Sequence, residues 1–117
     1  MMNTLEKEIL RKVAAILGLE LLEKVNIYLN GDLKPAGASV PAGDGFIDLP
    51  WEGHVVFVDL EPKANWGHPC QYLAIQQDGD DHIGMLAQMP PFLQSDDPTV
   101  YRLLWRGPLA PEWTVNA

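Results

Sequence analysis

The stretch that decides the fold is His54-Val55-Val56-Phe57-Val58-Asp59-Leu60. Successive side chains of a strand point to opposite faces of the sheet. This stretch is apolar at every position from Val55 to Val58, so both of its faces are apolar. Strands of this kind are buried on both sides, and the sequence therefore predicts a central strand.

A hairpin is expected after this strand. The runs Tyr72–Gln76 and His82–Gln88 flank Asp78-Gly79-Asp80-Asp81, and Asp-Gly supplies the positive φ angles that a tight turn needs. Pro90-Pro91 ends the second run. The pattern predicts a last strand over Thr99–Arg106, with Tyr101, Leu103 and Trp105 on one face and Arg102 and Arg106 on the other.

A helix is expected before the strands. Asn3 or Thr4 can cap its start, Asn3 and Glu6 have the spacing of a capping box, and Gly18 is placed to end it. Apolar residues recur at three- and four-residue spacing, as on the core-facing side of a helix: Leu5, Ile9, Val13, Ile16 and Leu17.

Residues 19–30 fit two structures. Their apolar spacing suits a second helix that ends at Asn30-Gly31, but Val25, Ile27 and Leu29 also alternate as they would in a strand. No local rule decides between the two, and we take helix as the working assignment.

The Gly- and Pro-rich stretch of residues 31–50 is predicted to be a long surface loop, with Phe46-Ile47 and Leu49 fixed to the body of the protein. A chain of 117 residues fits one domain, residues 1–117. The expected fold class is α+β, with an N-terminal helix or helices packed on a mostly antiparallel sheet of about four strands.

Charge limits the classes of partner. Sixteen acidic residues against eight basic ones give a net charge of −8, which disfavours nucleic acid and anionic membranes because both bind through Lys and Arg. The excess lies after Asn30, and Asp78, Asp80 and Asp81 belong to a stretch without basic residues. These acids are either a solvated turn or a surface that steers a basic protein partner.

Two features bear on the compartment. The N-terminus lacks the pattern of a signal peptide, and charges interrupt every apolar run long before it reaches the length of a membrane span. The single cysteine, Cys70, rules out an intramolecular disulfide and fits a reducing compartment. We expect a cytoplasmic protein.

The segment Glu61–Cys70 concentrates rare residue types between two predicted strands. Cys70 with His68 or His54 has the donor types of a nucleophile and its base, and the same three residues suit a metal site. Neither has the flanking motif or paired spacing of a known site. The structural alternative is a turn with a buried thiol, and a further one is a partner-binding loop anchored by Trp66.

These observations predict a non-enzymatic protein-binding or regulatory domain without a cofactor. An inhibitor or immunity protein against a basic toxin is one version of it, with Trp66, Asp78, Asp80 and Asp81 as the candidate contacts. The alternative is a small Cys/His hydrolase or metal-binding enzyme centred on His54, His68 and Cys70.

Overall fold

The computed structural model describes residues 2–60, 69–88 and 101–109, which contain two helices and seven strands. The helices are α1 (Thr4–Leu17) and α2 (Leu19–Leu22). The strands are β1 (Asn26–Asn30), β2 (Ser39–Ala42), β3 (Gly45–Asp48), β4 (Gly53–Asp59), β5 (Cys70–Gln76), β6 (His82–Ala87) and β7 (Tyr101–Arg106). None of the described helices is long and apolar enough to span a membrane.

Five of the strands form one antiparallel sheet in the order β6-β5-β4-β1-β7. β4 is its middle strand and every residue of β4 is buried, which confirms the prediction from the apolar run around Val55–Val58. β2 and β3 form a separate two-stranded sheet. The α+β prediction is confirmed, and the main sheet has one strand more than the expected four.

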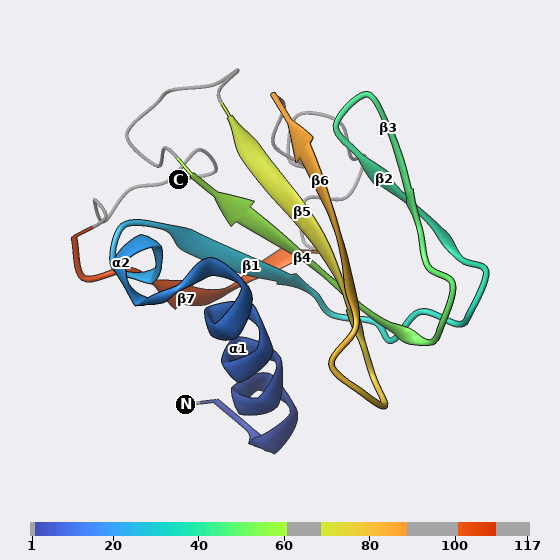
Figure 1. Cartoon of the computed structure of the whole chain (residues 1–117), viewed down its shortest axis with the longest axis horizontal. Coiled ribbons are helices and arrows are strands. Elements are labelled where there is room, and N and C mark those ends of the chain that lie inside the picture. Colours follow the sequence, from blue (N-terminus) through green and yellow to red (C-terminus); the bar gives the residue numbers. More distant parts are fainter. Residues whose placement is uncertain (1, 61–68, 89–100, 110–117) are drawn as a thin grey trace.

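The sheet is covered on both faces (Figure 1). Side chains from α1, including Ile9 and Val13, pack on one face, which we call the helix face. The β2–β3 hairpin packs on the other, the hairpin face, through four buried side chains: Val40, Ala42, Ile47 and Leu49. Burying one aliphatic side chain stabilises the fold by about 1.5–3 kcal/mol, so each layer depends on a few such residues.

α1 begins and ends where the sequence predicts. Asn3 Oδ1 accepts a hydrogen bond from the Glu6 N–H at 2.8 Å, and Glu6 Oε1 accepts one from the Asn3 N–H at 3.0 Å, which completes the capping box. Gly18 ends the helix with a φ of 88°, in the region where a side chain would be strained.

The helical assignment of residues 19–30 is wrong for the second half of that segment. Only Leu19–Leu22 is helical, and Asn26–Asn30 is strand β1, between β4 and β7. All five residues of β1 are buried. Burial on both faces between two neighbouring strands outweighs the local helical spacing, and no local pattern contains those neighbours.

The prediction of a structureless loop over residues 31–50 is also wrong. β2 and β3 pair from Ser39↔Asp48 to Ala42↔Gly45, with Gly43 in the turn at a φ of 59°. Ile47 and Leu49 are buried as expected, but Phe46 is 64% exposed. The Gly and Pro content of this segment favoured a loop, although buried and exposed residues alternate in its two short strands.

β7 does not have the two simple faces that its sequence suggests. Its register with β1 shifts between Ile27 and Tyr28, which pair with Trp105 and Leu103 and leave Leu104 as an extra residue. A bulge of this kind reverses the alternation of side chains. Arg102 therefore contacts Glu6 of α1 on the helix face, whereas Arg106 pairs with Asn26, which belongs to the opposite face.

Candidate functional site

The structure separates two of the three residues predicted for a Cys/His site. Cys70 begins β5 and belongs to the hairpin-face cluster. His54 lies in β4 next to Val55, on the side of Val56 and Val58, which belong to the helix-face cluster. The sheet lies between the two side chains, so His54 cannot act as the base for Cys70 or share a metal with it in this arrangement.

Cys70 has the environment of a structural thiol. It is fully buried, and Sγ donates a hydrogen bond to the Ala87 carbonyl oxygen at 3.5 Å. Burial, and secondarily the negative charge of Asp59, raise the pKa of Cys70 to about 12. The thiolate is the nucleophilic form of cysteine, and this environment disfavours it.

His54 is 2% exposed, and its pKa is lowered by burial and by the positive charges of Lys12 and Lys34. The described residues contain no group of three or more His, Cys, Asp or Glu side chains that could hold a metal ion. His68 and Trp66 lie outside the described residues, so the predictions that involve them stay predictions.

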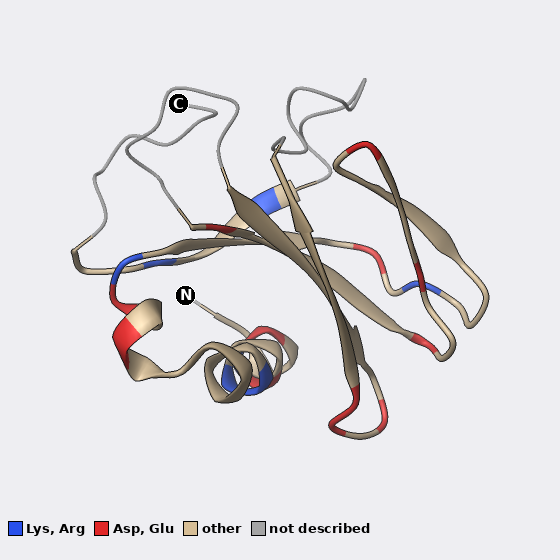
Figure 2. Ribbon diagram, turned by 45° about the horizontal axis from the view of Figure 1, so that its top comes forward, with Lys and Arg blue, Asp and Glu red and all other residues tan. Residues whose placement is uncertain are grey.

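The predicted acidic contacts lie together at one end of the main sheet. Asp78, Asp80 and Asp81 occupy the turn between β5 and β6, and all three are exposed (Figure 2). We call residues 78–81 the acidic turn.

Hydrogen bonds within residues 76–82, and one from Trp51, fix the conformation of the acidic turn. The Gln76 N–H donates to the Asp81 carbonyl oxygen at 3.0 Å, and the Asp81 N–H donates to Gln76 Oε1 at 3.2 Å. Asp81 Oδ1 accepts from the His82 N–H at 3.0 Å, and its Oδ2 accepts from Trp51 Nε1 at 3.4 Å. The turn is therefore held from within and by the segment that precedes β4.

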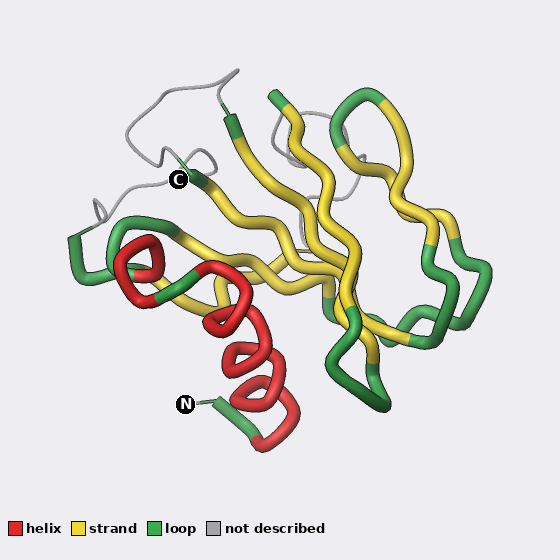
Figure 3. Tube along the Cα trace, in the orientation of Figure 1, coloured by secondary structure: helices red, strands yellow, loops and turns green. Residues whose placement is uncertain are grey.

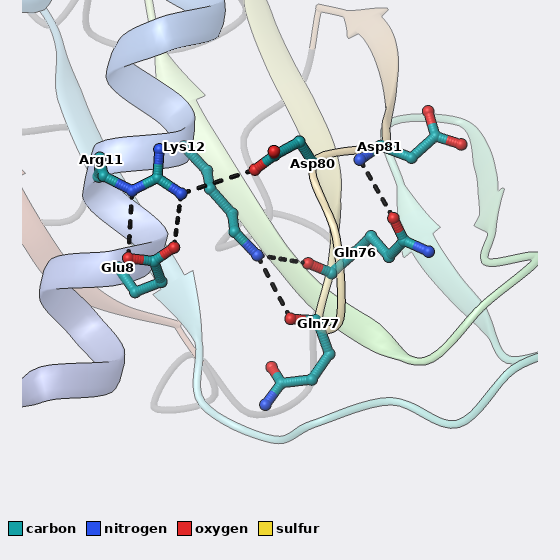
Figure 4. Close-up of polar contacts among 7 residues, drawn as sticks. All are labelled: Glu8, Arg11, Lys12, Gln76, Gln77, Asp80 and Asp81. Atoms are coloured by element: carbon teal, nitrogen blue, oxygen red, sulfur yellow. Dashed lines mark hydrogen bonds and ion pairs between the residues drawn. The ribbon is translucent and has the colours of Figure 1, made fainter.

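Helix α1 supports the same turn from the helix face (Figure 4). Lys12 Nζ donates to the carbonyl oxygens of Gln76 at 2.9 Å and of Gln77 at 3.3 Å. Arg11 Nη2 lies 3.5 Å from Asp80 Oδ1, and the Asp80 side chain stays 85% exposed. The sequence signal for this support was weak, because Arg11 and Lys12 are simply the polar positions next to an apolar helical stripe.

A cleft of about 500 Å³ lies between α1 and the acidic turn. Its lining mixes charges of both signs with apolar side chains: Arg11, Lys12, Ala15, Ile16, Ile75, Asp80, Asp81 and His82. Arg11 and Lys12 reach the turn from α1, and Asp80 and Asp81, which also line the cleft, are exposed. The arrangement gives a small exposed acidic turn, next to a cleft with both charged and apolar side chains.

Comparison with known proteins adds no information about function. No family model, no curated protein and no solved structure matches this chain.

Proposed function

We propose that this chain is a non-enzymatic domain that binds another protein with a basic surface, and that the acidic turn is the contact. The observation that carries the proposal is the exposure of Asp78, Asp80 and Asp81 on an ordered turn. Hydrogen bonds join this turn to Gln76 and Trp51, and Lys12 of α1 bonds to the two residues that precede it. An inhibitor of a basic toxin or nuclease is one version of this function.

Fixed exposed carboxylates favour binding in two ways. Their charge speeds the encounter with a basic surface. Their fixed backbone also reduces the conformational entropy that is lost when the complex forms, because the turn is already ordered before it binds. Lys12 bonds to backbone carbonyls rather than to these carboxylates, so it orders the turn without forming an ion pair with them.

The size of the expected effect follows from exposed ion pairs. Each such pair contributes about 0.2–1 kcal/mol, so the loss of three pairs is expected to cost roughly 1.5 kcal/mol. Since about 1.4 kcal/mol corresponds to a tenfold change in affinity, the triple variant Asp78→Asn, Asp80→Asn, Asp81→Asn is expected to bind about ten times more weakly.

The test is affinity capture from native cells at low ionic strength, followed by binding measurements with each purified candidate. The matched control removes three exposed charges elsewhere: Glu20→Gln, Glu23→Gln and Asp44→Asn. The proposal expects a basic protein that binds the wild type and the control equally and the triple variant more weakly. Recovery of no partner, or equal binding by both triple variants, would count against it.

A further inference from the structure

The two edges of the main sheet differ in how they are protected. β7, at one edge, carries Arg102 and Arg106 and the bulge opposite Ile27 and Tyr28. Charged residues and bulges are the usual devices that keep an edge strand from pairing with another chain. β6, at the other edge, has no Lys, Arg, Asp, Glu or Pro between His82 and Ala87, and its register with β5 is continuous.

The open backbone groups of β6 follow from its pairing with β5. The hydrogen bond from the Gln76 N–H to the Asp81 oxygen makes these two residues a hydrogen-bonded pair. Such pairs recur at every second residue of an antiparallel ladder. Ile83, Met85 and Ala87 therefore bond to β5, whereas the N–H and C=O groups of Gly84 and Leu86 and the C=O group of His82 point away from the described sheet. The His82 N–H is already bonded to Asp81 Oδ1 at 3.0 Å.

The side chains of β6 are unequally covered. Ile83, Met85 and Ala87 pack against the hairpin-face cluster, but no residue of β6 belongs to the helix-face cluster. Leu86 is consequently 73% exposed. Figure 3 shows that α1 lies near the turn between β5 and β6 and does not extend over the opposite end of β6.

We propose that β6 pairs antiparallel with β6 of a second copy of this chain, about a twofold axis at Gly84. In this register Gly84 pairs with itself, and the His82 carbonyl oxygen accepts from the Leu86 N–H of the other copy. Leu86 is then covered by a neighbouring side chain, and Ile83 lies opposite Met85 on the other face.

Charge and symmetry favour a second copy as the occupant. The strand is free of acidic and basic residues apart from His82, so self-pairing brings no carboxylates face to face. In the antiparallel register Asp81 lies opposite Ala87, and the two acidic turns lie at opposite ends of the joined strands. Because β7 is protected, the pairing uses the one unprotected edge of the main sheet among the described strands, and it closes as a dimer. Both acidic turns stay free for a partner.

The register is tested by cysteine cross-linking of the full chain. At the twofold axis the two Gly84 Cα atoms would be about 5.5 Å apart, within disulfide range. The atoms nearest to a new Cβ are Gln71 Nε2 at 3.1 Å and Leu73 Cδ2 at 3.4 Å, and both belong to side chains. Two Leu86 residues would lie about 14 Å apart along the strands. Gly84→Cys is expected to form a covalent dimer under mild oxidation, and Leu86→Cys is not; equal cross-linking of the two would overturn the register.

The pairing itself is tested by sedimentation of the wild type, Leu86→Pro and Leu86→Ala. Proline removes an outward N–H without removing a bond to β5, whereas alanine keeps that N–H. We expect the wild type to form a dimer, and its association to strengthen with added salt because salt screens the repulsion between the acidic chains. The Leu86→Ala variant should remain a dimer. The Leu86→Pro variant should associate at least a hundredfold more weakly. A wild-type monomer at millimolar concentration would overturn the proposal.

Amide exchange gives an independent readout if the proline variant does not fold. In the wild type, the Gly84 and Leu86 amides should become protected as the protein concentration rises. Protection that appears only with a basic partner would assign this edge to that partner and overturn self-pairing.

Discussion

Lys12 links α1 to the two residues that precede the acidic turn, and Lys12→Met removes its ammonium group while keeping an apolar stem. Nζ donates to the Gln76 and Gln77 carbonyl oxygens at 2.9 and 3.3 Å. A hydrogen bond to a charged group is worth about 1.5–3 kcal/mol net. Both carbonyls can accept water instead, so we expect the free energy of unfolding to fall by about 1–2 kcal/mol in total, which is roughly 4–8 °C in Tm for a chain of this length.

The assay is urea unfolding followed by circular dichroism, with amide exchange at residues 77–81 as a second measurement. The matched control is Lys7→Met, which removes an exposed cation from the same helix. Lys12→Met should lower stability more than the control and speed exchange in the acidic turn. If the two variants have the same stability and the turn exchanges as in the wild type, α1 does not hold the turn and the reasoning is refuted.

Three further predictions follow from the described contacts. Burial lowers the pKa of His54 below the ordinary value of about 6.5 for histidine, so the unfolded chain takes up a proton at mildly acidic pH that the folded chain does not. Stability should therefore decrease as pH falls below about 6.5, and His54→Phe should flatten this dependence in urea titrations. With its pKa raised to about 12, Cys70 should react with a thiol reagent at pH 8 only at the rate of unfolding, and rapid reaction without denaturant would contradict its burial. Gly43→Ala should destabilise the protein by about 1–3 kcal/mol, because Gly43 has a φ of 59° and a Cβ there would lie 2.7 Å from Ala87 Cβ. The control is Gly45→Ala, whose new Cβ meets no atom within 4 Å. This control should have nearly wild-type stability when both variants are compared by thermal unfolding.

The elements that the sequence predicted well are those with local causes. The capping box of Asn3 and Glu6, the stop at Gly18 and the Asp-Gly turn all depend on residues a few positions apart. β4 is apolar on both faces, and that pattern is sufficient to identify a central strand. These features needed no knowledge of the neighbouring elements.

The features that the sequence missed have causes far apart in the chain. β1 is a strand because β4 and β7 lie on either side of it, and the bulge at Leu104 arises only from that pairing. Lys12 meets the carbonyl of Gln76 across 64 positions. The separation of His54 from Cys70 depends on strand register, which the spacing of two residues in the sequence does not determine.

We propose the acidic turn as the contact surface for a basic protein. The most direct test is a titration of isotope-labelled chain with the basic protein captured from native cells, followed amide by amide in heteronuclear spectra. The account predicts that the largest shifts fall on Gln77–His82 and that they disappear as ionic strength rises. Shifts centred on the β2–β3 hairpin or on β7, or shifts that are insensitive to salt, would contradict it.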